Sequence, residues 1–242
     1  MKGLPTIRSF GQRALLLEWP PEISLSTHQK VLQCVSSIET KLFNQVLEVV
    51  PTYHSLAIYL KEREDVSSFV EQLKLVLGQD SEATRGRPQI ITVPVCYDLE
   101  FALDLEEISS RICLSIPEII ELHTQPLYKV YFLGFLPGFP YLGGLDTRLH
   151  VPRRECPRPI IEKGNVGIGG KQTGLYPLDS PGGWNIIGKT PLRLFEAEKS
   201  SPTQINTGDF VKFEPITRTE FDLIRVEVES DTFQWRKEAT GD

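Results

Sequence analysis

The chain has 242 residues, with 26 Lys and Arg against 32 Asp and Glu, and a formal net charge of −6 at pH 7. Its 40% hydrophobic and 24% charged residues are typical of a globular protein with one or two domains. The acidic balance argues against a nucleic-acid partner, and no apolar run resembles a signal peptide or a membrane span. The 4 cysteines are scattered and form no C-x-x-C pair, so we expect reduced thiols and a cytoplasmic protein.

The N-terminal third predicts a small α+β domain over residues 1–84. Its apolar, strand-like runs cover residues 4–18, 45–50 and 55–60. Its predicted helices run from Ser24 or Ser26 to about Thr40 and from Asp65 to near Gly78. Gly11 marks a turn or bulge in the first run. The order strand, helix, strand, strand, helix, with one more strand, predicts a ferredoxin-like sandwich.

The polar stretch 79–87 has no hydrophobic periodicity and predicts a linker to a second domain over residues 85–242. A strand is expected over 89–97, followed by two short helices, the second of which begins at Ser115. From Tyr128 onward, short β-like runs alternate with Gly and Pro corners. This pattern predicts a mainly-β closed barrel.

Gly and Pro recur in four segments of this region, GFLPGFPYLGGLD (134–146), PRRECPRP (152–159), GNVGIGGKQTGLYP (164–177) and SPGGWNIIGKTP (180–191). Glycine is favourable only where the backbone needs positive φ or a close approach. Such density predicts tight corners and backbone lying close to a ligand. We therefore look for function here.

The last segment contains a formal match to the nucleotide-binding pattern G-x-x-x-x-G-K-[ST], over residues 183–190. The context argues against a phosphate-binding loop. No buried strand precedes it, bulky side chains such as Trp184 fill it, and a strand pattern rather than a helix follows Pro191. We expect a strand here, with Trp184 packed in the barrel or its cleft.

Candidate site residues come from three groups of side chains. His123 ends the second short helix, where it can be a structural cap or an acid, base or phosphate ligand. Arg153 and Arg154 are preferred, within a proline-rich cluster that includes Arg158, as ligands of a carboxylate or phosphate. Lys171, Gln172 and Thr173 follow a run of glycines and are donors for an anion nest or side chains of a plain hairpin.

Phe135 and Phe139 form either a rigid aromatic corner or the wall of a hydrophobic groove. The many Asp and Glu residues follow no metal-ligand spacing, so no metal site is predicted.

Several long motifs together resemble the subunit 1 family of allophanate-hydrolase-type proteins, which includes 5-oxoprolinase B subunits and the kinase inhibitor KipI. These motifs are PTYHSLAIYL (51–60), VPVCYDLEFALDLEEI (93–108), almost all of residues 123–191, and NTGDFVKFEPI (206–216). The chain departs from the family at Leu99 and Ala102-Leu103, where glycines and a proline are usual. The resemblance implies a ferredoxin-like N-terminal part, a cyclophilin-like C-terminal barrel, and a pocket role for His123 and Tyr128.

The resemblance implies one subunit of an ATP-dependent enzyme that hydrolyses 5-oxoproline to L-glutamate and is inactive alone. Its expected partners are a C-type (KipA-like) and an A-type subunit, and its cofactor is ATP with Mg at the level of the complex. In that scheme His123 handles a proton or phosphoryl charge, Arg153 and Arg154 hold a carboxylate or phosphate, and Lys171, Gln172 and Thr173 complete the anion site.

Two alternatives remain open at this point. A KipI-type regulator would use the aromatic groove to bind a histidine kinase and would need no chemistry. A subunit of a biotin-dependent urea or allophanate carboxyltransferase would need a biotin-bearing partner, because the chain has no Ala-Met-Lys-Met motif. No metal or biotin is expected on this chain itself.

Overall fold

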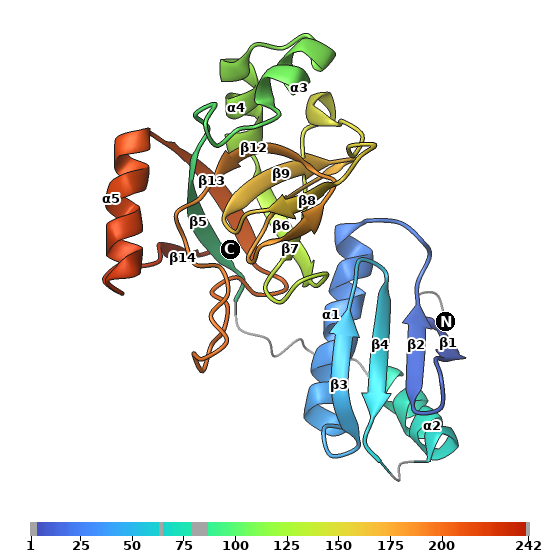
Figure 1. Cartoon of the computed structure of the whole chain (residues 1–242). Helices are drawn as coiled ribbons and strands as arrows, with labels where there is room; N and C mark the ends of the chain where they lie inside the picture. Colours follow the sequence, from blue (N-terminus) through green and yellow to red (C-terminus); the bar gives the residue numbers. More distant parts are fainter. Residues whose placement is uncertain (1–3, 63–64, 79–86, 241–242) are drawn as a thin grey trace. The chain divides into compact units, whose positions relative to one another are not determined.

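The computed structural model describes residues 4–62, 65–78 and 87–240, which fall into two compact units, Met1–Gly86 and Arg87–Asp242 (Figure 1). Apart from Arg87, the predicted linker over residues 79–87 lies outside the described residues. No helix in the described ranges is long and apolar enough to span a bilayer.

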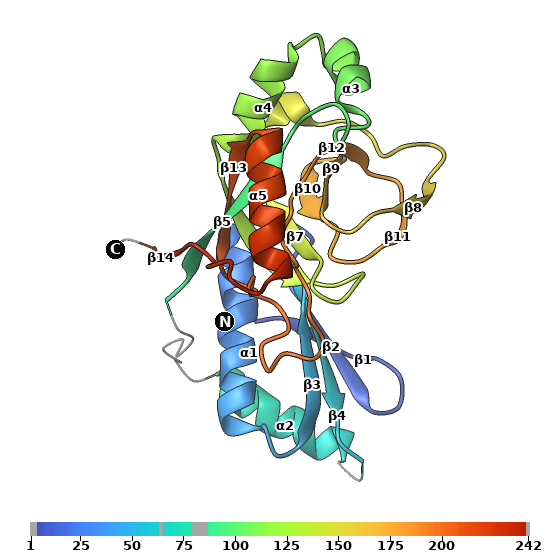
Figure 2. The same ribbon diagram turned by 60° about the vertical axis from the view of Figure 1, so that its left-hand side comes forward.

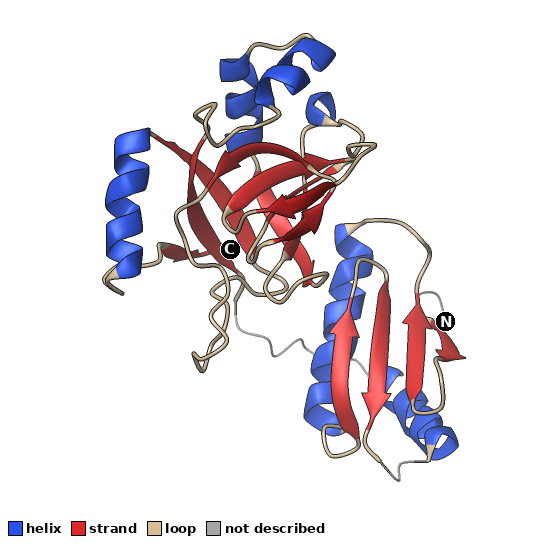
Figure 3. Cartoon of the chain, in the orientation of Figure 1, coloured by secondary structure: helices blue, strands red, loops and turns tan. Residues whose placement is uncertain are grey.

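The N-terminal unit is a four-stranded sheet with two helices. Its elements are β1 (Thr6–Ser9), β2 (Ala14–Glu18), α1 (Leu25–Lys41), β3 (Val46–Pro51), β4 (Ser55–Leu60) and α2 (Val66–Leu77). The strand order is β1-β2-β4-β3 and every neighbouring pair is antiparallel. Both helices lie on one face of the sheet (Figure 3). The predicted elements are confirmed, and the additional strand is β1, which precedes the others.

Local capping and packing explain why these segments form helices. The Thr27 N–H donates to Ser24 Oγ at the start of α1, and the Ser68 N–H donates to Asp65 Oδ2 at the start of α2. The apolar helix faces and one face of the sheet form a common core that includes Val31, Leu17 and Ile58, all fully buried. The turn at Gly11, with φ +78, separates the predicted first run into β1 and β2.

The C-terminal unit contains the remaining elements. In chain order they are β5 (Gln89–Cys96), α3 (Leu105–Ile112), α4 (Ile116–Thr124), β6 (Leu127–Leu133), β7 (Pro140–Gly143), the short 3-10 turn η1 (Thr147–Leu149), β8 (Arg158–Ile161), β9 (Asn165–Gly169), β10 (Gln172–Leu175), β11 (Ser180–Gly182), β12 (Asn185–Lys189), β13 (Phe210–Ile216), α5 (Arg218–Glu229) and β14 (Lys237–Ala239). A capping box between Ser115 and Glu118 begins α4.

Seven strands close into a barrel in the order β12-β9-β10-β7-β6-β13-β5, because Lys189 at the end of β12 pairs with Cys96 at the end of β5. The predicted closed barrel is confirmed. The pair β13–β5 is parallel, the other pairs in the ring are antiparallel, and β14 is added beside the start of β5. Helices α3 and α4 lie at one end of the barrel, and α5 lies outside it against β5 (Figures 1 and 2).

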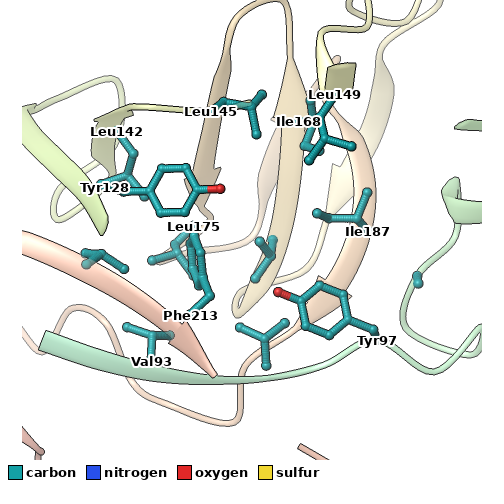
Figure 4. Close-up of a cluster of buried hydrophobic side chains, with 14 of the residues drawn as sticks. Val93, Tyr97, Tyr128, Leu142, Leu145, Leu149, Ile168, Leu175, Ile187 and Phe213 are labelled. Atoms are coloured by element: carbon teal, nitrogen blue, oxygen red, sulfur yellow. The ribbon is translucent and has the colours of Figure 1, made fainter. Parts of the chain in front are cut away.

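The barrel interior is filled by side chains from all of its walls (Figure 4). The hydroxyl groups of Tyr97 and Tyr128 point toward the middle of this cluster. On β9, Val166 and Ile168 belong to the interior cluster. Because side chains alternate along a strand, Asn165, Gly167 and Gly169 face outward. The segment that matched the nucleotide-binding pattern forms strand β12, and no helix follows it directly, as predicted. The strand expected after Pro191 is not formed, and Ser180–Gly182, expected to be a turn, forms the short strand β11.

Candidate functional site

The outer face of the β9–β10 hairpin is made of glycine because Trp184 lies directly on it. A Cβ atom built on Gly169 would be 2.7 Å from Trp184 Cδ1, and one on Gly174 would be 2.9 Å from Trp184 Cζ3. Real Cβ atoms do not approach so closely, so only glycine fits. At these positions, the glycines of the run that resembled a phosphate-binding loop therefore make room for the indole ring to pack on the hairpin.

Phe139 is the centre of an aromatic cluster outside the barrel. Its ring meets those of Tyr141, Tyr176 and Trp184 edge to face, with centroids 5.2, 5.4 and 5.5 Å apart. Phe139 and Trp184 are buried, whereas Phe135, which contacts Phe139 from the loop before β7, is 63% exposed and has φ 67. These contacts make a rigid aromatic corner with one exposed ring at its edge.

Arg153 lies on this aromatic corner and is exposed. Its guanidinium carbon is 5.7 Å from the centroid of the Trp184 ring. No ion pair within 4.0 Å joins Arg153 to a carboxylate of the described residues. The Gly170 N–H donates to Val151 O at 2.7 Å, which ties the segment before Arg153 to the turn that carries the exposed Lys171. Arg153 and Lys171 thus belong to connected segments at the hairpin turn.

Arg154 and Arg158 have a different environment, because both bind the carboxylate of Asp104. Arg154 Nη1 lies 2.7 Å from Asp104 Oδ1 and 3.3 Å from Glu107 Oε2. Arg158 binds Asp104 bidentately at 2.7 and 2.8 Å, and the Ile186 N–H donates to the same carboxylate at 2.6 Å. Asp104 is only 2% exposed, and its hydrogen bond to Arg158 raises the pKa of that arginine. This cluster joins α3 to the β8 and β12 strands, and the carboxylate at its centre was not singled out by sequence.

His123 is fully buried, inside the barrel. Its Nδ1 lies 2.8 Å from the Tyr97 hydroxyl, and its Nε2 lies 2.8 Å from Thr173 Oγ1. The Tyr128 hydroxyl donates to the His123 carbonyl, and the His123 ring stacks on Phe213 with centroids 4.5 Å apart. Burial lowers the pKa of His123 from 6.5 to about 3. The imidazole is therefore neutral at physiological pH and has no exposed surface.

The structure divides the predicted site residues between the two faces of one hairpin. His123, Tyr128 and Thr173 are brought together in the interior, where the buried Thr173 hydroxyl bonds His123 Nε2 and the Gly167 carbonyl. Phe135, Phe139, Trp184 and Arg153 share the exterior, with Lys171 at the turn. Gln172 is partly buried, and its Nε2 atom has no hydrogen-bond partner within the described part of the chain.

Two neighbouring pockets lie elsewhere on the unit, and sequence reasoning missed both. One of about 310 Å³ lies between the loop before α3 and strands β8, β9 and β12, and one of about 630 Å³ lies beside α5. They share the lining residues Glu100, Phe101, Glu162 and Lys189. Of the arginine cluster considered from sequence, Arg158 lines the smaller pocket, whereas the preferred Arg153 and Arg154 line neither. The outward-facing Asn165 and Lys189 were the available signal, but nothing in the sequence shows that their strands are neighbours.

Comparison with known proteins assigns the chain to a family. Residues 5–205 match the family described as carboxyltransferase domain, subdomain C and D. The chain is 37% identical over 235 residues to the B subunit of 5-oxoprolinase from Bacillus subtilis, covering 91% of the chain and 97% of that protein. It is 37% identical over 206 residues to the B subunit of 5-oxoprolinase from Escherichia coli O157:H7, covering 85% of the chain and 93% of that protein.

Solved structures agree with this assignment. TTHA0988 is 34% identical with a TM-score of 0.76, over 84% of this chain and 40% of that one, so the chain spans less than half of it. A conserved uncharacterised protein of Pyrococcus horikoshii is 41% identical with a TM-score of 0.54, over 89% of this chain and all of that one. Urea carboxylase of Kluyveromyces lactis shares the fold, with a TM-score of 0.79 at 19% identity over 98% of this chain and 24% of that one. By sequence over almost its whole length, the chain belongs to the 5-oxoprolinase B-subunit family of carboxyltransferase subdomain C and D proteins.

Proposed function

We propose that the chain is the B subunit of a cytoplasmic, ATP-dependent 5-oxoprolinase that opens 5-oxoproline to L-glutamate and that the chain is inactive alone. The observation that carries this proposal is the 37% identity to the B subunit of 5-oxoprolinase from Bacillus subtilis over 97% of that protein. Because the similarity covers almost the whole of that B subunit, it supports the same role for this chain as one subunit of a similar complex. The expected partners are a C-type (KipA-like) subunit and an A-type subunit.

The chemistry explains the need for ATP. A γ-lactam is an amide stabilised by resonance, so its carbonyl carbon is a poor electrophile. Transfer of the γ-phosphoryl group of ATP to the lactam oxygen, with release of ADP, activates that carbon toward water. After water adds, the C–N bond breaks as the nitrogen takes up a proton, and hydrolysis of the resulting acyl phosphate gives glutamate and inorganic phosphate. ATP and its Mg belong to the complex, and we assign neither Mg nor biotin to a residue of this chain.

Within this scheme the exposed corner around Arg153 is the surface we assign to an anionic group of a ligand. Arg153 is exposed, lies over Trp184 and has no carboxylate partner among the described residues, so its guanidinium is available for a carboxylate or phosphate. Lys171 adds a second positive charge at the connected hairpin turn, and Gln172 follows it. The corner is open rather than enclosed, which suits a site that another polypeptide completes.

The roles of the other predicted residues change. Arg154 is held by Asp104 and Glu107, so we assign it to the support of the Arg153 segment. His123 is neutral and buried, so we assign it and Thr173 to the positioning of the β9–β10 hairpin rather than to proton transfer. Tyr128 supports His123 from within the barrel.

The fold names expected from the family belong to the same proposal. The strand order β1-β2-β4-β3 with both helices on one face supports a ferredoxin-like arrangement in which the N-terminal β1 takes the edge position. The closed barrel with helices at its end and side supports the cyclophilin-like assignment of the second unit.

The test is to co-express the chain with its two partner subunits and to measure ATP-coupled release of glutamate from 5-oxoproline. Arg153→Ala should lower kcat/KM at least about tenfold, the loss expected for a hydrogen-bonded charge. Arg148→Ala is the matched control, because that arginine is exposed and pairs with its neighbour Asp146. Turnover by the isolated chain, or unchanged turnover of the Arg153→Ala complex, would contradict the proposal.

The exposed Phe135 favours one alternative, a KipI-type regulator that binds a histidine kinase. A phenylalanine that is 63% exposed, on a backbone with φ 67, is a candidate anchor for a partner protein. Phe135→Ala would then abolish inhibition of kinase autophosphorylation by the isolated chain. Full 5-oxoprolinase turnover by the complex, together with no effect of the chain on the kinase, would exclude this alternative.

A further inference from the structure

The smaller pocket of the C-terminal unit, which we call the Asn165 pocket, has a volume of about 310 Å³. Phe101, Leu103, Ile160 and Ile186 form apolar walls, and Asn165 and Lys189 lie side by side on its floor. Paired positions on neighbouring strands project to the same face of a sheet. Both side chains therefore come from the outer face of the barrel.

Asn165 is 6% exposed, yet its side-chain amide makes no hydrogen bond with any residue that the structure describes. The nearby Asn185 shows the usual arrangement, because its amide donates to the carbonyls of Pro152 and Ile168. The amide atoms of Asn165 do not belong to the buried side-chain atoms that lack a partner, so they open into the pocket that this residue lines. An amide held in this way at the floor of a pocket is available to pair with a ligand.

Lys189 is the cation that the pocket can offer. Its Nζ lies 2.5 Å from Glu162 Oε2 and 5.7 Å from the centroid of the Phe101 ring. The Glu162 side chain is 66% exposed, so water can replace Lys189 as its partner at little cost. The second cation, Arg158, is already bound bidentately by Asp104. One amide and one ammonium group thus face the pocket. Its lining also includes the carboxylates of Glu100, which is paired with Arg218, and of Glu162.

We propose that this pocket binds a small lactam that carries a carboxylate. A five-membered ring forces its amide into the cis form, so the N–H and C=O groups lie on one edge. The primary amide of Asn165 offers an oxygen and an N–H on one edge as well, so the two groups can form a pair of hydrogen bonds. Lys189 binds the carboxylate, and Phe101 and Ile186 contact the ring methylenes.

This inference rests on the proposed function, because among such lactams it names 5-oxoproline as the natural ligand. The pocket is distinct from the exposed corner at Arg153. Asn165 and Gly169, the residue beneath Trp184, are four positions apart on β9, or about 13 Å at the usual rise of a strand. Substitutions at the two places therefore report on different contacts.

The experiment measures the KM for 5-oxoproline of the co-expressed complex, and the affinity of the isolated chain by calorimetry. Asn165→Asp keeps the shape of the side chain but replaces its N–H donor by a charged oxygen. We expect KM and Kd to rise at least about tenfold. Lys189→Met should remove the preference for 5-oxoproline over 2-pyrrolidinone, which has no carboxylate. L-Proline, which lacks the lactam carbonyl, should bind at least about tenfold more weakly than 5-oxoproline.

Lys199→Met is the matched control, because Lys199 also pairs with a glutamate but lies outside the pocket. Asn165→Ala is the control for folding. The Asn165 side chain makes no hydrogen bond with the described residues, so its removal should leave the free energy of unfolding nearly unchanged. An active complex in which Asn165→Asp leaves KM unchanged would overturn the lactam site and leave the proposed function intact. An inactive complex, with 5-oxoproline still held by this chain through Asn165, would overturn the proposed function and support the site.

Discussion

The Nε2 atom of His123 lies 2.8 Å from Oγ1 of Thr173, which joins helix α4 to strand β10 inside the barrel. The Thr173 hydroxyl donates to the Gly167 carbonyl at 3.1 Å, so it accepts a hydrogen bond from His123. This assigns the proton to Nε2 and leaves Nδ1 to accept from the Tyr97 hydroxyl. The hydrogen bonds that run from Tyr97 through His123 and Thr173 to Gly167 can all form only when the imidazole is neutral, because a protonated Nδ1 could not accept from Tyr97.

The neutral His123 makes stability depend on pH. Its pKa is about 3 in the folded chain against an ordinary 6.5, so below pH 6.5 the unfolded chain takes up a proton that the folded chain does not. The contribution of the neutral His123 to the free energy of unfolding is fully present above pH 6.5. It is lost as the pH falls toward 3, at up to about 1.4 kcal/mol per pH unit.

Urea unfolding between pH 7 and pH 5 checks this, because most carboxylates are still ionised there. His123→Gln keeps a hydrogen-bonding side chain but cannot titrate, so its stability should fall less steeply over the same interval. Parallel slopes for the two proteins would show that the imidazole does not remain neutral.

Asp104 should be the most important carboxylate for the stability of the C-terminal unit. Asp104→Asn leaves Arg154 and Arg158 without their shared anion, and we expect a loss of about 2–4 kcal/mol in the free energy of unfolding. The two arginines are 29% and 24% exposed, so water reduces the cost below that of a fully buried cluster. Glu107→Gln, which removes the exposed partner of the same Arg154, should change stability by less than about 0.5 kcal/mol. Equal effects of the two substitutions would contradict this ranking.

The packing of Trp184 on glycine predicts strong coupling between two positions. Gly169→Ala places a methyl group where the indole lies and should cost about 1–3 kcal/mol. In a Trp184→Leu background the same change should cost at least about 1 kcal/mol less, because the obstructing ring is gone. A double-mutant cycle in denaturant measures this coupling, and additive losses would mean that the ring does not limit Gly169.

The four cysteines should divide into two reactivity classes. Cys113 and Cys156 are exposed, whereas Cys34 and Cys96 are buried. Burial raises the pKa of Cys34 to about 12 and also raises the pKa of Cys96, so few thiolates form at these positions. An aromatic disulfide reagent should label two thiols rapidly in the folded chain and all four in urea. Rapid labelling of a third thiol without denaturant would disagree with the burial of Cys34 and Cys96.

Much of the fold follows from local patterns. Hydrophobic spacing and capping residues such as Ser24, Asp65 and Ser115 predict the helices, since their causes lie within a few residues of one another. The Gly and Pro corners after Tyr128 predict a closed barrel for the same reason. The long motifs also place the chain in its family.

The site could not be derived in this way, because it depends on contacts between distant residues. Arg153 and Arg154 are adjacent in sequence, yet one is exposed on an indole ring and the other is paired with Asp104. His123 was interpreted either as a helix cap or as a pocket residue that handles a proton, but its helix places the imidazole inside the barrel.

The amino-acid sequence by itself determined the four helices before Tyr128, the strand-rich second half, the barrel class and the family, since these depend on periodicity and on short-range sterics. Helix α5 (Arg218–Glu229) was not predicted, although the capping box of Thr217 and Glu220 is a local signal for it. Only the tertiary structure decided that β9 lies beside β12, which brings Asn165 next to Lys189, and that Asp104 meets Arg158. Strand pairing and register arise from the burial of side chains far apart in the chain, and no local pattern specifies which strand becomes the neighbour of which.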